Sequence, residues 1–499
     1  MSFARDVVAA APPERLALVE LARDGTRREW AFGEVTRRAA CMAAALDAAG
    51  VHRGEVVLTL VGNRPEWVVT MVACFRAGYV VLPCTEQLRA KDLRLRLDVA
   101  QPAAVVCDER NRAELEAAGP SCPVILVPDE ALFATGREDA APPYADLAPG
   151  DPCLITFTSG TAGEAKAVVH GERYLDGQRV QAEHWLDARP GDLVWCTAAS
   201  GWSKSARNVF IAPWMRGAAA LLHDARFDAH ERLELLEREQ VNVLCMAPTE
   251  YRVIAAHAVP RPVASLRSLV AAGEALNPEV LRAFRETTGL WIRDGYGQTE
   301  TGQTTGQLAG RDPKPGSMGP ALPGVRLWIE EGELCLDPLS DPTFFLGYLG
   351  EGVRHGADGA WVVDADRRDG GTWRTGDRVT QDEDGYLHFE GRADDVIISA
   401  GYRIGPFEVE SALVSHPAVA EAAAVAAPDP ERGAVVRAIV VLRDGHDGSP
   451  ELAAALQDHV KQQTAPYKYP RIVEFAADLP KTASGKVRRN LLRSRPGGA

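Results

Sequence analysis

Short apolar runs that alternate with helical patterns constrain the fold of this chain more than any other feature. The apolar runs, each short enough for one buried strand, are 56–61, 79–84, 103–107, 192–198, 241–248 and 266–273. The segments 64–78 and 229–240 carry apolar residues at helical spacing. Strands that alternate with helices predict parallel sheets built from βαβ units. Because ligands of such sheets bind beyond the carboxyl ends of the strands, we expect functional residues in the loops that follow them.

The chain divides into two parts of different composition. With 499 residues it is too long for one compact core. A connector rich in Pro and Gly at 310–324 precedes two segments typical of antiparallel β structure, 325–336 and 386–392. From Asp394 onward a smaller unit of strands and helices has apolar faces of its own. We therefore predict an α/β protein: a large N-terminal domain (1–393) of parallel βαβ sheets plus a β-rich part, and a small α+β C-terminal domain (394–499).

Charge and cysteine usage exclude several classes of protein. The formal net charge of −14 disfavours a general nucleic-acid or anionic-membrane surface. We interpret the basic run at 485–495 as the solvated face of a short helix rather than a nucleic-acid tail. The nine cysteines are scattered without a C-x-x-C pair, which is typical of a reducing cytosol and not of a disulfide framework or a zinc site. No apolar run is long enough for a membrane span and no signal-peptide core is present, so we predict a cytoplasmic location.

The segment FTSGTAGEAKAVVH at 157–170 collects small residues, hydroxyls and one lysine. A Walker loop needs Gly before the lysine and a hydroxyl residue after it, but Ala165 and Ala167 flank Lys166. Small residues still let backbone N–H groups approach a polyanion closely. On its own the segment fits a solvated turn equally well.

Four further segments lie where strands end. They are AAGEAL at 271–276, RDGYGQTETG at 293–302, WRTGDRV at 373–379 and GRADD at 391–395. They supply a flat small-residue shelf, an aromatic ring, a hydroxyl, carboxylates and a guanidinium, which are the groups that a nucleotide needs. Each segment alone is typical of ordinary packing or turns, but their order and spacing together favour a nucleotide site.

Together these segments resemble the adenylate-forming superfamily, which includes acyl-CoA synthetases, peptide-synthetase adenylation domains and firefly-type luciferases. The segments 399–433 and 460–489 look most like medium-chain acyl-CoA synthetases, and the resemblance covers the chain from about residue 30. It implies a mobile C-terminal domain that rotates between two half-reactions. A carboxylic acid first reacts with ATP to give acyl-adenylate and pyrophosphate, and coenzyme A then takes the acyl group and releases AMP.

The resemblance also implies roles for the nucleotide-binding motifs. Residues that would fold over the β- and γ-phosphates of ATP are Thr158, Ser159, Gly160, Thr161, Gly163 and Lys166. Residues of the adenine and ribose motifs are Gly273, Glu274, Ala275, Asp294, Gly295, Tyr296, Gly297, Gln298, Asp377 and Arg392. Within this set Tyr296 would stack on adenine, Asp294 would lie near its amino group, and Asp377 with Arg392 would hold the ribose. Thr299 would contact the α-phosphate and the acyl carboxylate, and Glu300 would bind Mg²⁺.

The C-terminal matches concern catalysis and coenzyme A. Lys486 would neutralise charge between the carboxylate and the α-phosphate, and Asp394 matches the hinge. Arg403 would lie near the adenylate. Residues matching coenzyme A contacts are Ala400, Gly401, Tyr402, Arg432, Lys461, Tyr469, Pro470 and Arg471. Clustered cations suit a ligand so rich in phosphate.

The resemblance leaves the acid open among medium-chain, branched and aromatic acids. Gly297 stands where acetate-restricted relatives carry Trp, which predicts a deeper acyl pocket, with Trp202 in its wall segment 200–210 and a second wall at 270–272. Lys204 and Arg207, three residues apart, would share one helix face. They would meet a polar substituent of the acid or coenzyme A, or else point to solvent, and we favour solvent.

The phosphate segment departs from the superfamily at Ala162 and Ala165, where Thr and Pro are usual. One hydroxyl contact would be lost, so phosphate binding or pyrophosphate release would differ. Two alternatives stay open besides the synthetase, and the second is motivated by this departure. One is an adenylation enzyme that loads a carrier protein, and the other is a non-catalytic nucleotide-binding scaffold. The second is opposed by the presence of Lys166, Glu300 and Lys486 together.

Overall fold

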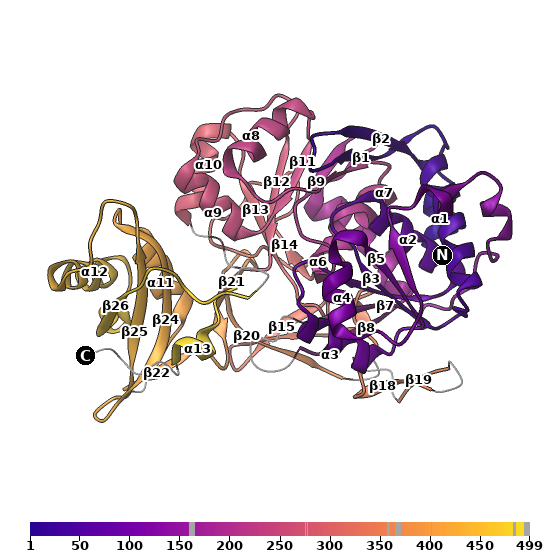
Figure 1. The fold of residues 1–499 in the computed structure, drawn as a ribbon. Helices are drawn as coiled ribbons and strands as arrows, with labels where there is room; N and C mark the ends of the chain where they lie inside the picture. Colours follow the sequence, from indigo (N-terminus) through magenta and orange to yellow (C-terminus); the bar gives the residue numbers. More distant parts are fainter. Residues whose placement is uncertain are drawn as a thin grey trace.

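A computed structural model describes residues 1–158, 165–274, 276, 278–356, 360–364, 371–400, 402–482 and 486–493. Figure 1 shows a large body formed by the N-terminal part of the chain and a smaller lobe, orange to yellow, formed by the C-terminal part. The predicted α/β class is confirmed, because the large part is built on mixed sheets dominated by parallel strands. No helix of the described residues is long and apolar enough to cross a membrane.

The first sheet runs through the upper half of the N-terminal body. Its core strands are parallel, and β2 and β14 are antiparallel at its two edges. In spatial order the strands are β14 (Thr305–Gly306), β13 (Ile292–Tyr296), β12 (Ser268–Ala272), β11 (Val243–Met246), β9 (Leu193–Cys196), β10 (Ala219–His223), β1 (Leu16–Leu21) and β2 (Arg27–Ala31).

The second sheet joins a parallel half to a mixed half, in which β17 and β18 pair in parallel and the other neighbours are antiparallel. The parallel half contains β7 and the strands from β4 to β6, and β8 turns back antiparallel on β7. In spatial order the strands are β19 (Trp361–Val363), β18 (Gly352–His355), β17 (Gly347–Leu349), β8 (Ala167–Gly171), β7 (Pro152–Phe157), β4 (Val80–Cys84), β3 (Val56–Leu60), β5 (Ala104–Asp108) and β6 (Val124–Val127).

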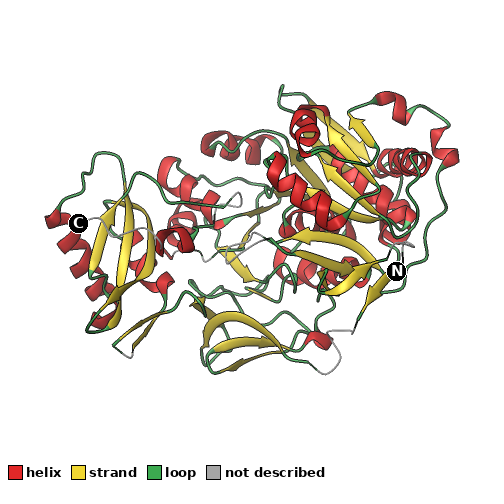
Figure 2. Cartoon of the chain, turned by 60° about the horizontal axis from the view of Figure 1, so that its bottom comes forward, coloured by secondary structure: helices red, strands yellow, loops and turns green. Residues whose placement is uncertain are grey.

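Three smaller sheets follow. The predicted antiparallel part of the large body is confirmed as β15 (Leu327–Glu330), β16 (Glu333–Leu336), β20 (Trp373–Gln381) and β21 (Leu387–Arg392). A hairpin pairs β22 (Ile397–Ser399) with β23 (Tyr402–Ile404). The last sheet is β24 (Val419–Asp429), β25 (Gly433–Leu442) and β26 (Ile472–Phe475). Figure 2 shows this last sheet set apart from the sheets of the N-terminal body.

Helices cover the faces of these sheets. In the N-terminal body they are α1 (Phe32–Ala48), α2 (Pro65–Ala77), α3 (Ala90–Ala100), α4 (Arg112–Ala118), α5 (Arg173–Gln181), α6 (Ser203–Ala206), α7 (Ala212–Met215), α8 (Ala229–Arg238), α9 (Pro248–His257) and α10 (Pro278–Thr288). In the C-terminal lobe they are α11 (Pro406–Val414), α12 (Pro450–Gln463) and α13 (Arg489–Arg493). Helix α2 shows how single residues set helix boundaries. Pro65 lies in its first turn, and Gly78, with φ of 74°, ends the helix.

The C-terminal lobe has a hydrophobic core of its own. Ile397, Val409, Leu413, Val440 and Leu456 are fully buried and pack in one cluster drawn from β22 to α12. A separate core is what a segment needs in order to fold as a unit. The basic run near the C-terminus forms the predicted short helix, α13, in which Arg493 is exposed and Arg489 is half-buried. Arg489 pairs with Glu410 at 2.7 Å, and Arg493 pairs with Asp395.

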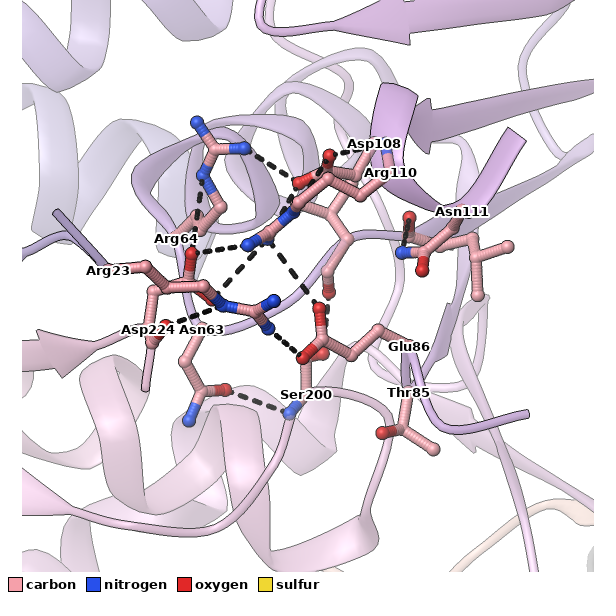
Figure 3. A network of polar contacts seen from close by, with 12 residues as sticks. Arg23, Asn63, Arg64, Thr85, Glu86, Asp108, Arg110, Asn111, Ser200 and Asp224 are labelled. Atoms are coloured by element: carbon pink, nitrogen blue, oxygen red, sulfur yellow. Dashed lines mark hydrogen bonds and ion pairs between the residues drawn. The ribbon is translucent and has the colours of Figure 1, made fainter. Parts of the chain in front are cut away.

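A network of ion pairs joins the two large sheets (Figure 3). Asp108, at the end of β5, receives hydrogen bonds from Arg64 at 2.7 Å and from Arg110 at 2.9 Å. Arg110 also bonds to Asp224, which follows β10 of the other sheet, at 2.8 Å. Burial opposes ionisation of Asp108, but the two arginines outweigh it and lower its pKa. The carboxyl ends of strands from both sheets are therefore held side by side.

Candidate functional site

The predicted adenine and ribose residues come from two sheets that meet at one place. Glu274 follows β12, and Tyr296 ends the neighbouring strand β13, whose Gly295 pairs with Ala272 in parallel register. Asp377 lies on β20 of the antiparallel sheet, paired with Arg392 of β21. The loops after parallel strands thus face an antiparallel sheet, as expected for a ligand site beyond the carboxyl ends of strands.

Hydrogen bonds connect these sheets around one buried carboxylate. The Tyr296 hydroxyl donates to Asp377 Oδ2 at 2.5 Å, and Gln298 Nε2 donates to the same oxygen at 2.8 Å. Trp373 Nε1 in turn donates to Gln298 Oε1 at 3.1 Å. Burial raises the pKa of Asp377, while Arg392 and the two donors lower it. The group is preorganised, because each member is held by its neighbour.

Arg392 contacts carboxylates on two segments. Its Nη1 lies 3.4 Å from Asp377 Oδ1, and its Nε lies 3.3 Å from Oδ1 of Asp394, the predicted hinge residue. The Asp394 carbonyl also accepts a hydrogen bond from Arg493 at 3.1 Å. The predicted ribose pair is therefore adjacent to the predicted hinge.

Two acidic residues of the adenine motifs differ in their electrostatics. Burial raises the pKa of Glu274, but Arg252 and a hydrogen bond from Thr249 at 2.8 Å outweigh burial and lower it. Burial raises the pKa of Asp294 to about 8, against a hydrogen bond from the Gly295 backbone at 2.8 Å. At neutral pH the site therefore contains an ionised Glu274 and a mostly protonated Asp294.

Lys486 of the C-terminal lobe reaches the same site. Its pKa is lowered by burial and by two nearby cations, Lys204 and Arg392, and raised by the carboxylates of Glu274 and Asp377. Charges influence one another in this way only within electrostatic range, so this lysine acts on the nucleotide residues of the N-terminal body.

Tyr348 links the described ends of the phosphate segment to Glu300, the predicted Mg²⁺ ligand. Thr158 and Lys166 close the segment, since the Lys166 N–H donates to Thr158 Oγ1 at 3.0 Å. The Lys166 ammonium lies 3.2 Å from a Glu351 oxygen and over the ring of Tyr348, 4.6 Å from its centroid. The Tyr348 hydroxyl donates to Glu300 Oε1 at 2.8 Å. Lys166 and Glu300 are therefore brought together around one aromatic side chain.

Several predicted residues lie outside the described part of the chain. They are Ser159, Gly160, Thr161, Gly163, Ala275 and Gly401, together with the side chain of Arg403.

The turn that carries Thr299 and Glu300 is closed tightly. The Gly302 N–H donates to the Gln298 carbonyl at 3.0 Å, and the Phe345 N–H donates to the Glu300 carbonyl at 2.8 Å. A Cβ on Gly297 would lie 1.7 Å from the Gly302 carbonyl oxygen, so only glycine fits there. The space that a Gly297 side chain would enter is filled by the backbone of the same turn, and the deeper acyl pocket that we expect from this glycine stays a prediction. Thr299 itself lies partly exposed at the tip of the turn.

Lys204 and Arg207 do not point to solvent as we favoured. Lys204 Nζ donates to the Ala272 carbonyl at 2.9 Å, and so bridges the two predicted walls of the acyl pocket. Trp202 precedes it at the start of α6, half-buried. Arg207 is only 4% exposed, and its Nε and Nη1 have no hydrogen-bond partner among the described residues. Helix α6 is a single turn that continues as a wider π-helical turn beginning at Arg207.

The predicted coenzyme A residues gather on the C-terminal lobe. Lys461 and Arg471 both lie over the Tyr469 ring, at 4.4 and 5.2 Å from its centroid. Tyr402 stacks on Tyr467 at 4.4 Å. The Ala400 N–H donates to the Arg432 carbonyl at 3.0 Å, and Pro470 is buried beside this group. Exposed rings with adjacent cations suit a base and its phosphates.

Sequence reasoning missed four residues that support the site: Thr249, Arg252, Tyr348 and Trp373. Trp373 begins the segment 373–379 that the sequence singles out, but it had no predicted role, and the other three belong to no chemically distinctive local pattern. Their partners lie far away in the sequence, and only the order of the strands brings them together. A tyrosine directly after Gly347 at a strand start was the one visible signal.

Comparisons with known proteins agree with this geometry. Residues 5–348 match the family model described as AMP-binding enzyme, and residues 408–486 match the AMP-binding enzyme C-terminal domain. The uncharacterized acyl–CoA ligase YtcI of Bacillus subtilis is 39% identical, covering 97% of this chain and 94% of that protein. The mitochondrial acyl-coenzyme A synthetase ACSM4 of Rattus norvegicus is 38% identical, with 95% and 85% covered. A crystal structure of a Brucella canis acyl-CoA synthetase matches with a TM-score of 0.72 at 34% identity, covering 97% of this chain and 92% of that one.

The fold, the site and these similarities define an enzyme of the acid–thiol ligase class. The chain belongs to the AMP-binding enzyme family, within the adenylate-forming superfamily that its motifs resemble.

Proposed function

We propose that this chain is an ATP-dependent acyl-CoA synthetase that works in two half-reactions. In the first, a carboxylate oxygen of an acid attacks the α-phosphorus of ATP, the bond to the bridging oxygen breaks, and acyl-AMP and pyrophosphate form. In the second, the thiolate of coenzyme A attacks the acyl carbon, and AMP leaves with the electron pair of the broken bond. Two steps are needed because a carboxylate is a poor electrophile whereas AMP is a good leaving group.

The observation that carries this proposal is the electrostatic interaction of Lys486 with Glu274, Asp377 and Arg392. The first half-reaction brings one anion onto another, which is chiefly an electrostatic problem. A cation that the C-terminal lobe delivers into the nucleotide site would lower that barrier directly. Thr299, at the tip of its turn, would contact the α-phosphate and the reacting carboxylate.

Asp377 offers one oxygen to the ribose. Its Oδ2 already accepts hydrogen bonds from Tyr296 and Gln298, which occupy both lone pairs of that oxygen. Among the described residues, the one contact of Oδ1 is a long one with Arg392 at 3.4 Å, so this oxygen would accept the ribose hydroxyls. The fixed Tyr296 ring and the shelf of Gly273, Glu274 and Ala275 would enclose the adenine.

The phosphate end would be held by the segment from Thr158 to Lys166 and by Glu300. Magnesium prefers oxygen ligands and often takes one protein carboxylate together with phosphates and water. Glu300 fits that need, because Oε1 is oriented by Tyr348 and Oε2 has no partner among the described residues. The bound ion would neutralise phosphate charge.

We assign the C-terminal domain to 394–499 and the N-terminal domain to 1–393, with Asp394 as the hinge between them. Rotation there would withdraw Lys486 and bring Ala400, Gly401 and Tyr402 to the acyl-adenylate, with Arg403 near it. The surface formed by Arg432, Lys461, Tyr469, Pro470 and Arg471 would hold the nucleotide of coenzyme A. The separate core of the lobe and the exposed cations on Tyr469 support this assignment.

The acid in this proposal is a medium-chain, branched or aryl carboxylic acid. The ammonium of Lys204, which bridges the pocket walls, limits how far an unsubstituted chain can extend. All nine cysteines are free and eight are buried, which supports a reducing compartment such as the cytoplasm.

Acid-dependent pyrophosphate release from ATP tests the proposal, over a panel from acetate to decanoate and substituted benzoates, with and without coenzyme A. Multiple turnovers that require coenzyme A, with AMP and a thioester as products, are expected. Release limited to one equivalent whether or not coenzyme A is present would point to a carrier-protein acceptor instead. Absence of AMP with every acid would reduce the chain to a nucleotide-binding scaffold.

A further inference from the structure

Tyr348 stands where the phosphate segment and the Glu300 turn meet. It lies on β17, which pairs antiparallel with β8, and its direct partner there is Val168. Strand β8 begins immediately after Lys166. On its other side, the chain just before β17 holds the Glu300 turn, since the Phe345 N–H donates to the Glu300 carbonyl at 2.8 Å. One short strand therefore touches the base of both functional segments.

The side chain of Tyr348 makes one contact with each segment. Its hydroxyl donates to Glu300 Oε1 at 2.8 Å, and its ring lies 4.6 Å below the Lys166 ammonium. A hydrogen bond to a carboxylate is stronger than one between neutral groups, and it fixes which oxygen faces the opposite way. A cation within about 6 Å of a ring centroid is attracted by the ring face. The two contacts use different parts of the side chain, so they can be removed separately.

Packing fixes the ring that makes these contacts. Phe345, which is fully buried, meets Tyr348 edge-to-face at 5.1 Å, and Trp373 meets Phe345 at 5.3 Å. Aromatic pairs of this geometry hold each other in place beyond their buried area. Through Trp373 the same cluster reaches Gln298 and the carboxylate of Asp377. The ring is therefore anchored to the nucleotide end of the site.

We propose that Tyr348 is a positioning residue that aligns Glu300 and Lys166 on one polyphosphate. Its hydroxyl orients the carboxylate, leaving Oε2 directed away for a magnesium ion that the phosphates share. Its ring keeps the lysine ammonium above the same place, where it would meet the terminal phosphates. This inference rests on the proposed function, because it assumes that ATP is the ligand of these two segments.

Separate substitutions test the two contacts. Tyr348→Phe keeps the ring, its packing on Phe345 and the contact with Lys166, and removes only the hydroxyl. Tyr348→Leu removes both contacts. Tyr386 provides a matched control, because Lys314 lies 4.8 Å from its ring centroid but is paired with Asp382 at 2.9 Å.

The measurement is ATP and AMP binding by titration calorimetry at stepped Mg²⁺ concentrations, without acid or turnover. Loss of a group that orients a metal ligand weakens metal affinity by about tenfold or more, so Tyr348→Phe should need about tenfold more Mg²⁺ for half-maximal ATP binding. Its AMP affinity should not change. Tyr348→Leu should show the same shift and should also lose about two- to fivefold of its preference for ATP over AMP. Tyr386→Phe and Tyr386→Leu should match the wild type.

Each contrary result has a distinct meaning. Unchanged Mg²⁺ dependence in Tyr348→Phe would overturn the role of the hydroxyl, and unchanged preference for ATP in Tyr348→Leu would overturn the role of the ring. Equal losses of ATP and AMP affinity in both variants would mean that Tyr348 only supports packing. Failure of the wild-type protein to bind ATP would instead refute the proposed function, and the positioning role with it.

Discussion

Replacing Lys486 by Met tests the proposal that this lysine of the C-terminal lobe acts in acyl-adenylate formation and not in thioester formation. The substitution keeps most of the aliphatic stem and removes the ammonium that lies near Glu274 and Asp377. We expect acyl-adenylate formation to fall steeply, while thioester formation from supplied acyl-adenylate stays near the wild-type rate. The reason is that only the first half-reaction joins two anions at the position that Lys486 reaches.

The size of the effect follows from the surroundings of the ammonium. Two unit charges about 4 Å apart interact by about 4 kcal/mol at the effective dielectric constant typical of partly exposed sites. Lys486 is only partly buried, and Lys204 and Arg392 supply positive charge nearby, so we take about two thirds of that value. A loss of about 2.7 kcal/mol is a hundredfold in rate. Removing one preorganised donor from a transition state costs a similar amount, about 10²–10³-fold.

The assay pairs acid-dependent exchange of pyrophosphate into ATP with thioester formation from synthetic acyl-adenylate and coenzyme A. Lys481→Met is the matched control, because Lys481 lies in the same segment but pairs with Glu421 at 2.7 Å. It should retain both activities. If the two half-reactions of Lys486→Met fell by the same factor, the reasoning that places this lysine in the first step alone would be refuted.

Three further predictions concern Asp341, Lys204 and Gly297. Burial raises the pKa of Asp341 to about 7. The protonated carboxyl therefore contributes its full stability below about pH 4, and this contribution falls by about 1.4 kcal/mol per pH unit as the pH rises toward 7. The free energy of unfolding of Asp341→Asn relative to the wild type should therefore increase from pH 5 to pH 8 in denaturant titrations. The same difference in unfolding free energy at pH 5 and at pH 8 would contradict this. Lys204→Met should shift kcat/KM by about tenfold toward unsubstituted alkanoic acids, and an unchanged acid profile would rule out a pocket role. Gly297→Ala should lower activity by about a hundredfold, because its Cβ would displace the Gly302 carbonyl; near-normal activity would show that the turn can open.

The sequence predicted local structure well because local physics determines it. The strand at 79–84 and the helix that ends at Gly78 are set by apolar runs and a left-handed glycine, and both are confirmed. The order of strands is not local: β17 pairs with β8 across an insertion of more than a hundred residues, which brings Tyr348 to Lys166. No periodicity encodes that pairing, so the support of Glu300 could not be predicted.

The direction of Lys204 shows a different limit. A helix of one turn has too few residues for its face to be read from spacing. The loop before it is fixed by another sheet, since Asn63 accepts a hydrogen bond from the Ser200 N–H at 2.9 Å, and Gly201 packs against the backbone of Thr85 so closely that a Cβ would lie 2.5 Å away. Tertiary contacts therefore aim this lysine, and the preference for solvent was wrong.

Arg392 connects the nucleotide end of the site to the segment where the two parts of the chain meet. Its guanidinium contacts Asp377 at 3.4 Å and Asp394 at 3.3 Å, and its charge also acts on Lys486. A guanidinium is planar, with donors at fixed angles, so it can serve both carboxylates only while residue 394 keeps its present orientation. The proposed rotation at 394 would change the contact between Arg392 and Asp394. A nucleotide that favours one arrangement of Arg392 would then favour one domain position by the same difference in free energy.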